Sequence, residues 1–560
     1  MITRTAADLI VVNGCLRTQD ADCPAAEALA VCDGEIVAVG RNVDMAVWQG
    51  PETKVLDAQG ATVLPGLIES HMHLFLGGAA LGHLSAAGLC GLEALTLPLT
   101  VYRAANPSRK VLLVQGAEYS WFSGQTPPRR LLDALCGEVP LLLIAGDQHT
   151  AWSNTAGLRA AGLERGASLR PGNEVCVDAA GIATGTLREF QAFAPLLALA
   201  GEGRVSLGLV SGREPDPAPD AEAEALDVEI LARGLRHCAK LGITSIVNMD
   251  GNHYQLHLLQ RLRAAGRLTA RVRVPFHLRP DRDPADLSLA AEWHRAFSDR
   301  WLCSGFVKLF MDGVIDSGTA LVKDPGMTSG PPLFSAEAFA AHCVAIDRMG
   351  LQIAVHAIGD GAVSRVLDGY AAARHVNGPL DARHRIEHIE LLDRSDLPRM
   401  KSLGVVASIQ PCHVPGGQDF PLQPTLGLIP ESRRGDAYLA DSLLQAGIPL
   451  AFASDWPVAD VNPFRCMQTA ITRAPFSPRL PSERVLPEQA LAAYTAGGAY
   501  AEHTESWKGR LKPGFAADFI VLEGDLREVS PSEWGAVRVR QTFCGGRCVW
   551  DARNPGAVQG

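Results

Sequence analysis

The chain has 560 residues, of which 47% are hydrophobic and 20% are charged. This apolar fraction and a mean hydropathy of +0.07 exclude a disordered chain and allow a large buried core. The 51 basic and 61 acidic residues give a net charge of −10, which argues against nonspecific binding to nucleic acid or to anionic membranes. Length alone suggests roughly three to four domains of about 150 residues.

Targeting signals and cysteine spacing point to the cytoplasm. The segment at the start of the sequence lacks the apolar core of a secretory signal, and no run approaches the ~18 apolar residues of a spanning helix. The 13 cysteines show no metal-finger spacing, so we expect free thiols in a reducing compartment. We therefore predict a cytoplasmic protein that is not bound to a membrane.

Short apolar runs separated by turns occupy both ends of the chain. The pairs Asn13-Gly14 and Asp33-Gly34 favour hairpin turns near the start, and Lys512-Pro-Gly514 marks a turn near the end. The expected strands cover residues 9–12, 27–31, 35–39, 518–522 and parts of 537–549. Because each end is too small for a core of its own, we predict one discontinuous β-sandwich domain formed by residues 1–62 and 500–560.

The middle of the chain alternates strands with helices, as parallel βαβ units do. The expected strands cover residues 62–68, 244–248, 271–277, 305–310, 352–356, 385–389, 405–410 and 450–454, and helices include 223–241, 336–349 and 361–374. Eight such strands predict an α/β fold with a TIM-like (β/α)8 barrel, formed by residues 63–76 and 225–499.

A long insertion separates the first barrel strand from the second. Since most connections of this kind are short, residues 77–224 are predicted to form a separate insertion domain. Strand-like runs at 111–116 and 141–146 indicate structure of its own, and the acidic, proline-rich residues 214–224 are typical of a solvated loop. We expect this domain to cover the barrel mouth and to influence substrate specificity.

Metal-binding side chains follow several of the predicted strands. His71 and His73 lie two residues apart, so both imidazoles point to one side of the first strand. His356, His388 and Asp455 come at the ends of three later strands, and a barrel brings such ends together. Each histidine alone would be unremarkable in a protein core, but the set predicts a metal site. Zinc is the default ion, and other divalent transition metals also suit these ligands.

Lys308, in the fourth predicted strand, needs a separate explanation because a free ammonium beside dications is electrostatically unfavourable. One reading is an ordinary salt bridge to Asp312 or to another carboxylate. The other is a carbamate formed with CO2, which would be an anionic ligand able to bridge two metals. The residues by themselves leave both readings open.

These motifs resemble the amidohydrolase superfamily, specifically its family 3, the group of enzymes like N-substituted formamide deformylase. The similar segments are residues 13–14, 33–40, 65–73, 308–313, 356–360, 387–388, 454–455 and 509–518, with further similarity at 147–154, 184–189 and 410–413. Glu69 stands where many relatives have aspartate, a departure that leaves the ligands unchanged.

The resemblance implies a hydrolase of carbon–nitrogen bonds other than peptide bonds, with a binuclear metal centre. It assigns His71, His73 and Asp455 to one Zn2+ ion and His356 and His388 to the other. It also favours carboxylation of Lys308 as the bridging ligand. Attack by metal-bound hydroxide on a linear amide, such as an N-substituted formamide or N-acyl amine, is the expected reaction, with Asp455 transferring the proton.

The resemblance also implies substrate contacts outside the metal ligands, for which loop capping or domain packing is the competing interpretation. The candidate side chains are Asp147, His149, Trp152, Glu189, Asp312 and His413. The expected partner is a small amide-type substrate. The sequence does not determine the oligomeric state, and a homodimer is compatible with it. A cyclic amidase or deaminase would use nearly the same metals, and a metal-binding regulatory protein without catalysis is the alternative from another class.

Overall fold

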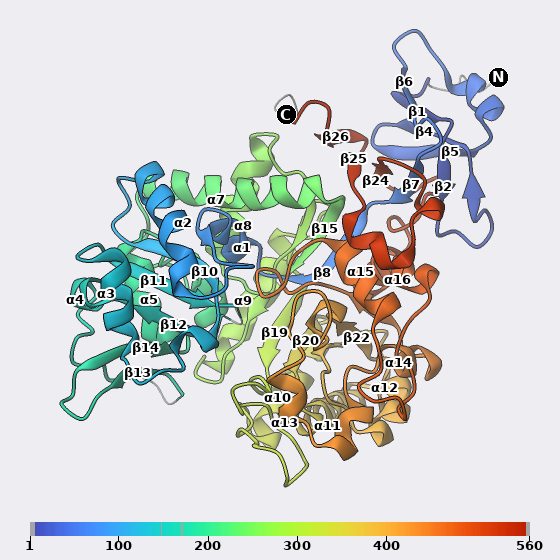
Figure 1. Cartoon of the computed structure of the whole chain (residues 1–560). Coiled ribbons are helices and arrows are strands. Elements are labelled where there is room, and N and C mark those ends of the chain that lie inside the picture. Colours follow the sequence, from blue (N-terminus) through green and yellow to red (C-terminus); the bar gives the residue numbers. More distant parts are fainter. Residues whose placement is uncertain (1–5, 147, 170–171, 556–560) are drawn as a thin grey trace. The chain divides into compact units, whose positions relative to one another are not determined.

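The computed structural model describes residues 6–146, 148–169 and 172–555 (Figure 1). The chain divides into two compact units. One contains the residues up to His73 together with those from Leu235 onward, and the other runs from Leu74 to Gly234. The second unit is therefore inserted into the first directly after the His71-Met-His73 motif.

Parallel strands form the centre of the first unit. One sheet has the order β18-β16-β15-β8, and a second has the order β17-β19-β20-β21-β22-β23, with parallel pairing throughout. Their bounds are β8 Leu67–Met72, β15 Ile243–Asn248, β16 Arg271–Arg273, β17 Phe276–His277, β18 Leu302–Cys303, β19 Phe306–Phe310, β20 Gln352–Ala357, β21 Arg385–His388, β22 Val406–Ile409 and β23 Leu450–Phe452. Each of the eight regions that the sequence predicted as a barrel strand therefore contains a strand.

The backbone connects the two ends of this strand series. The Asp455 amide, just after β23, donates to the His71 carbonyl of β8 over 2.8 Å. Helices separate the strands, as parallel pairing requires. They include α7 Ala221–Lys240, α8 His253–Ala264, α9 Leu287–Ala296, α10 Ala336–Arg348, α11 Asp360–Asn377, α12 Leu397–Leu403, α14 Ala440–Gln445 and α15 Pro463–Thr472. The arrangement is that of an α/β fold, and full closure into a barrel stays a prediction.

The first predicted barrel strand, residues 62–68, is wrong as a single element. It divides into β7, Thr62–Pro65, and β8, which belong to different sheets. Gly66 lies at the break, where its amide donates to the Asp518 carbonyl. A Cβ atom on Gly66 would lie only 2.1 Å from Thr244 Oγ1, so a larger residue would push β8 away from its partner β15.

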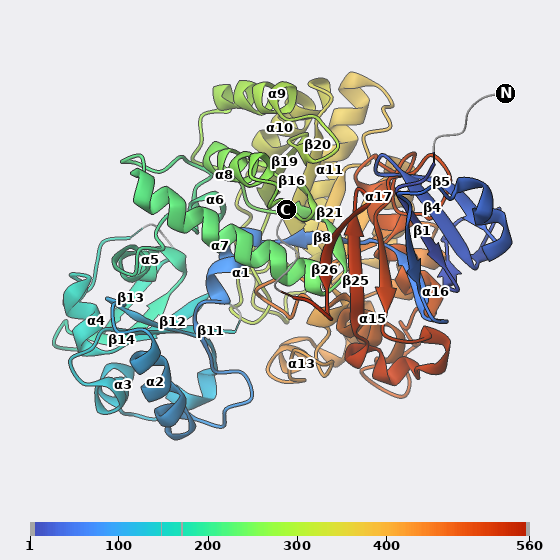
Figure 2. The same cartoon turned by 90° about the horizontal axis from the view of Figure 1, so that it is seen from above.

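The two ends of the chain share one sheet of the order β26-β25-β24-β7-β2-β3, of which Figure 1 labels β24, β7 and β2 next to one another. Figure 2 shows the blue N-terminal and red C-terminal parts of the chain side by side. A four-stranded sheet, β5-β4-β1-β6, comes from the N-terminal part alone. The bounds are β1 Leu9–Val12, β2 Cys15–Arg17, β3 Ala25–Ala26, β4 Ala28–Cys32, β5 Glu35–Gly40, β6 Lys54–Asp57, β24 Phe519–Leu522, β25 Val539–Cys544 and β26 Arg547–Asp551. Leu16 and Phe519 of the six-stranded sheet lie in the same buried cluster as Val31 of the four-stranded sheet. The apolar faces of the two sheets therefore pack against each other.

The inserted unit has its own mixed sheet, of the order β13-β14-β12-β11-β10-β9. The strands are β9 Leu84–Ser85, β10 Leu112–Ala117, β11 Leu141–Ala145, β12 Thr150–Ser153, β13 Glu174–Val177 and β14 Ala183–Arg188, with helices α1 Leu74–Ala80, α2 Leu92–Ala105, α3 Pro128–Cys136, α4 Thr155–Ala160, α5 Phe190–Leu199 and α6 Leu207–Val210. In β11, Leu142 packs into one buried cluster while Leu141 and Leu143 pack into another. Both faces of the sheet are covered, which explains the continuous apolar run. Its position over the barrel mouth stays a prediction.

Within the described ranges, no helix is both long enough and apolar enough to cross a membrane. All 13 cysteines lie in those ranges, and none of them forms a disulfide. Six of the thiols are buried, whereas Cys90 is exposed.

Candidate metal centre

The structure brings the predicted ligands together. Donor atoms of His71, His388 and Asp455 all lie within 4.8 Å of one another, and these side chains are buried. The ring of His388 lies 4.8 Å from that of His71 and 4.3 Å from that of His356, and His73 lies 5.8 Å from His71. Four imidazoles and one carboxylate therefore meet at the carboxyl ends of the parallel strands.

Two acidic residues orient the rings of the first histidine pair. Glu387 Oε2 lies 2.7 Å from His71 Nδ1, and Asp250 Oδ1 lies 2.9 Å from His73 Nδ1. Each carboxylate favours a proton on Nδ1, which leaves Nε2 as the donor atom that faces the cluster. Asp455 Oδ1 lies 3.3 and 3.2 Å from these two Nε2 atoms, and all three side chains are buried. His71 Nε2, His73 Nε2 and Asp455 Oδ1 thus face one another as three electron-pair donors, an arrangement that suits a cation bound between them.

Arg385 holds Glu387 in place. Its Nε donates to Glu387 Oε1 over 2.8 Å, and its Nη2 donates to the Ser70 carbonyl over 2.6 Å, one residue before His71. Burial raises the pKa of Glu387, but the charge of Arg385 and the hydrogen bond to His71 outweigh it and bring the pKa to about 2. Glu387 is therefore ionised, and it favours the ligand tautomer of His71.

The second histidine pair is held in the neutral form. Both ring nitrogens of His388 are buried with no hydrogen-bond partner among the described residues, and burial lowers its pKa well below 6.5. His356 Nε2 donates to the Gly313 carbonyl over 3.2 Å, which leaves Nδ1 as its ligand atom. Burial and the charge of Lys308 lower the pKa of His356 to about 3. Neutral imidazole is the form that binds metal.

Backbone strain coincides with this cluster. His388, Ile389 and Asp455 have φ values of 75°, 53° and 60°, in the left-handed region that side chains with a Cβ rarely adopt. Such conformations cost of order 1–3 kcal/mol each and persist where the surroundings impose them. Glu69 supplies one constraint, because its Oε1 accepts the Ser454 amide over 2.6 Å just before Asp455. The strand ends thus turn their side chains toward the cluster.

Lys308 lies fully buried in β19, and its Nζ has no hydrogen-bond partner among the described residues. Nζ sits 4.8 Å from the centre of the Phe310 ring, and burial lowers the pKa of Lys308 to about 8. The ion pair with Asp312 that the sequence left open does not form. Instead, both Asp312 oxygens accept backbone amides, from Leu321, Ile358 and Gly359 at 2.9, 3.0 and 2.9 Å.

Among the predicted substrate contacts in the first unit, His413 lies beside the cluster, with its ring 6.2 Å from that of His388. Its Nε2 lies 3.2 Å from the Ser454 carbonyl, and its Nδ1 lies 3.5 Å from Glu390 Oε1. Asp312 instead holds the loop after β19 through the backbone bonds given above. Contact of either residue with a substrate stays a prediction.

The other predicted contacts belong to the inserted unit. His149 Nδ1 and Glu189 Oε2 lie 3.0 Å apart. Trp152 is only 2% exposed and stacks on Phe122 with 4.4 Å between ring centres, so its structural role is core packing. Asp147 lies outside the described residues. That these side chains reach a substrate stays a prediction.

Sequence reasoning missed the residues that orient the predicted ligands through hydrogen bonds. These residues are Asp250, Arg385 and Glu387. Asp250 follows β15 by two residues, so an acidic residue at a strand end was the available signal. Glu387 precedes the ligand His388, but a period of two assigns it to the opposite face of the strand. Positive φ at His388 breaks that simple alternation.

We expect Asp250→Asn to weaken metal binding by about 10- to 100-fold, as outer-shell changes do. An amide at this position can donate to His73 Nδ1 and then favours the tautomer with the proton on Nε2, which cannot bind metal. Competition with a chelator measures the affinity. Asp368→Asn, which changes an exposed ion pair with Arg399, serves as the control. Equal affinity in the Asp250 and Asp368 variants would show that Asp250 does not orient His73.

Comparison with known proteins agrees with this geometry. The model of the amidohydrolase family matches residues 54–550. The chain is 29% identical to the protein LONG AFTER FAR-RED 3 of Arabidopsis thaliana, covering 97% of this chain and 92% of that one. It is 27% identical to the N-substituted formamide deformylase of Arthrobacter pascens, covering 96% and 97%. An uncharacterized metal-dependent hydrolase from Pyrococcus horikoshii OT3 shares the fold, with a TM-score of 0.71, 22% identity and coverage of 94% and 98%.

Parallel strands with candidate metal ligands at their carboxyl ends are an arrangement that suits a metal-dependent hydrolase. The match over residues 54–550 shows that the chain belongs to the amidohydrolase family, as its motifs predicted. It is accordingly a hydrolase that acts on carbon–nitrogen bonds.

Proposed function

We propose that this protein hydrolyses a linear amide, either an N-substituted formamide or an N-acyl amine, with the help of bound divalent metal. The observation that carries the proposal is the buried cluster of His71, His388 and Asp455, whose donor atoms lie within 4.8 Å of one another. The formamide deformylase that is 27% identical over nearly the whole chain supports the amide class. We also infer that the parallel strands close into a (β/α)8 barrel, with a β-sandwich built from both chain ends.

The donor set fits zinc, because neutral imidazole and carboxylate are its usual ligands. His71, His73 and Asp455 would hold one ion, His356 and His388 a second, and carboxylated Lys308 would bridge them. Bound zinc supplies an acidified water and polarises the substrate carbonyl. The free thiols agree with a cytoplasmic protein, which we also propose.

The residues of the chain account for the proton transfers. Burial raises the pKa of Asp455, but in the absence of metal the charge and hydrogen bonds of the His71 and His73 rings lower it well below 3.8 overall, so the side chain is an ionised carboxylate. In hydrolysis the carbonyl carbon gains the hydroxyl of water while its bond to nitrogen breaks. Asp455 would accept the proton of the attacking water and return it to the departing nitrogen, which leaves as a neutral amine.

Metal content and a substrate screen test this proposal together. We expect about one or two zinc ions per chain after expression with zinc. Among formamides, N-acyl amines, hydantoins and aminopurines, the first two classes should be hydrolysed fastest. Preferred turnover of hydantoins or aminopurines would identify a cyclic amidase or a deaminase instead. A protein without metal and without turnover on any panel member would contradict the hydrolase mechanism.

We expect carboxylation of Lys308 to be directly visible. Its buried Nζ has no hydrogen-bond partner among the described residues, and a pKa lowered from 10.5 to about 8 makes the neutral amine that attacks CO2 more accessible than in an ordinary lysine. Zinc-loaded protein prepared with 13C-bicarbonate should show one carbamate carbon signal by NMR. The signal should disappear in Lys308→Met, whereas Lys401→Met, a change on helix α12, should retain it. An unchanged signal in Lys308→Met would contradict the assignment.

A further inference from the structure

A cavity of about 590 Å3 lies at the end of the parallel strands opposite to the metal ligands. Arg271 at the start of β16, Gly305 just before β19 and Gln352 at the start of β20 all line it. The predicted ligand His356 lies near the other end of β20, and the remaining predicted histidine and aspartate ligands lie at the carboxyl ends of β8, β21 and β23. The cavity is therefore separate from the site described above.

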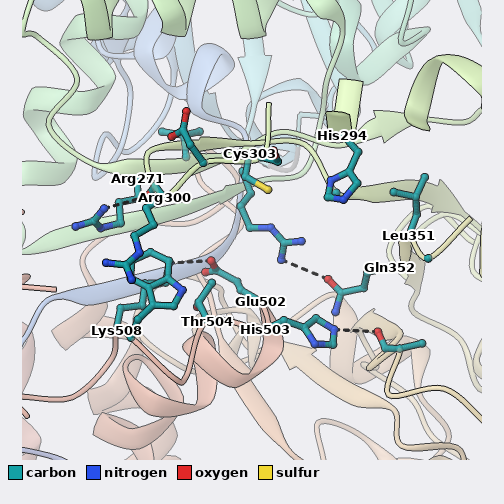
Figure 3. A pocket seen from close by; sticks show the side chains of 18 of the residues that line it. Arg271, His294, Arg300, Cys303, Leu351, Gln352, Glu502, His503, Thr504 and Lys508 are labelled. Atoms are coloured by element: carbon teal, nitrogen blue, oxygen red, sulfur yellow. Dashed lines mark hydrogen bonds and ion pairs between the residues drawn. The ribbon is translucent and has the colours of Figure 1, made fainter. Parts of the chain in front are cut away.

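Cys303 is the cysteine that lines this cavity, and it is partly exposed there. It pairs in register with Arg273 on the neighbouring parallel strand, so the two side chains project from the same face of the sheet. His294 of α9 lines the same cavity. Figure 3 shows Cys303 and His294 around this space. A thiol, an imidazole and a guanidinium thus occur together.

Gly305 shows how closely the two basic groups approach. A Cβ atom on Gly305 would lie 3.1 Å from His294 Nδ1 and 3.7 Å from an Nη atom of Arg273. His294 Nδ1 donates to the Ser304 carbonyl over 2.8 Å, which leaves Nε2 as the basic nitrogen of the neutral ring. The imidazole and the guanidinium therefore converge on the backbone that follows Cys303.

Arg273 differs from the other cations that line the cavity. Arg271 pairs with Asp518 at 2.7 Å and Lys508 pairs with Glu502 at 2.8 Å. Arg273 is 91% buried, its Nε has no hydrogen-bond partner, and its polar contact is the neutral Gln352 oxygen at 3.4 Å. Within the described residues it forms no carboxylate ion pair. The guanidinium also lies over the Phe306 ring, 5.1 Å from its centre, and a nearby anion would offset its charge.

The Cys303 thiolate fits that requirement. Burial raises the pKa of this thiol, but the hydrogen bond from His294 and the charge of Arg273 outweigh it, and the pKa falls below 9.0 overall. The pKa of His294 rises for the reciprocal reason, chiefly its hydrogen bond to Cys303. Glu502, which faces the thiol from the segment after α17 (Ala496–Ala501), opposes this shift, although Lys508 pairs with it. By contrast, burial raises the pKa of Cys238 and Cys544.

We propose that Cys303, with His294 and Arg273, forms an oxidation site whose thiolate reacts with hydroperoxides that enter the cavity. The sulfur attacks the terminal oxygen of the peroxide, so that an S–O bond forms as the O–O bond breaks. Sulfur is oxidised by two electrons to the sulfenic acid, and the peroxide is reduced. The His294 imidazolium protonates the departing hydroxide or alkoxide, which leaves as water or alcohol.

The test uses the full chain, with the exposed Cys90 as an internal reference. The protein is treated with limiting hydrogen peroxide, sulfenic acid is trapped with dimedone, and the adducts are located by mass spectrometry. We expect Cys303 to be labelled about tenfold more than Cys90 at pH 7, because an ordinary thiol with a pKa near 8.5 is only a few per cent ionised there. Equal or weaker labelling of Cys303 would overturn the proposal.

The pH dependence separates a paired thiolate from a merely accessible thiol. Alkylation of Cys303 by iodoacetamide should level off at lower pH than alkylation of Cys90. His294→Gln should shift the Cys303 profile upward, and Arg273→Gln should do the same, whereas His375→Gln, on an exposed part of α11, should not. Identical profiles for Cys303 and Cys90 would contradict the ion pair. None of these measurements depends on metal or on amide hydrolysis.

Discussion

Replacement of Asp455 by asparagine should lower kcat/KM for the amide substrate by about 10²- to 10⁴-fold, the usual contribution of a positioned proton-transfer group. The side chain keeps its shape but loses the charge that faces His71 and His73 at 3.3 and 3.2 Å. Metal binding should weaken as well, because an amide oxygen is a poorer ligand than a carboxylate. Steady-state kinetics and metal analysis on the same preparation measure both effects.

The two roles of Asp455 can be separated by adding zinc. If the residue only binds metal, saturating zinc should restore the activity of Asp455→Asn. If it also transfers the proton, kcat should stay low when the metal sites are full. Asp460→Asn, on the exposed surface a few residues later, provides the matched control. Wild-type kinetics in Asp455→Asn would contradict both roles.

Much of this site could be predicted because its ligands obey simple periodicity. His71 and His73 lie two residues apart at the end of β8, and Asp455 follows β23. Parallel strands place their carboxyl ends at one edge, so ligands dispersed over almost 400 residues of sequence meet there. A short apolar run also identifies each of these parallel strands without knowledge of its neighbours. Local patterns were therefore sufficient to predict that these side chains come together.

What could not be predicted depends on contacts between distant segments. Asp250 orients His73 across 177 residues, and Glu387 contacts His71 across 316. No local pattern connects these partners. The break at Gly66 has the same origin, since β7 and β8 read as one apolar run and only their pairing with β24 and β15 separates them. Tertiary pairing decided both features.

The second large effect concerns stability. Arg385 and Glu387 are fully buried and paired through Arg385 Nε at 2.8 Å, and Arg385 also donates to Ser408 Oγ at 2.9 Å. Removal of one partner from such a pair leaves an uncompensated buried charge, and Arg385→Met should therefore lower the free energy of unfolding by about 3–5 kcal/mol. Urea unfolding of metal-free protein isolates this effect from the stabilisation that metal binding adds.

A double-mutant cycle distinguishes the lost charge pair from lost packing. The variant with both Arg385→Met and Glu387→Met should be more stable than Arg385→Met alone, since no buried charge is left unpaired. Arg188→Met, which removes an exposed ion pair with Glu174, should stay close to wild type. If the double variant loses as much as the two single changes added together, the two side chains do not interact energetically.

Acidity provides an independent check on the same pair. The pKa of Glu387 is about 2 in the folded protein, below the ordinary value of 4.5. A carboxyl with a depressed folded pKa contributes stability above its unfolded pKa and loses it as the pH falls toward the folded value. The difference in stability between wild type and Arg385→Met should therefore be complete above pH 4.5 and shrink between pH 4.5 and 2. A difference that is constant over this range would show that Glu387 carries no charge in the fold, and the orientation of His71 would then need another cause.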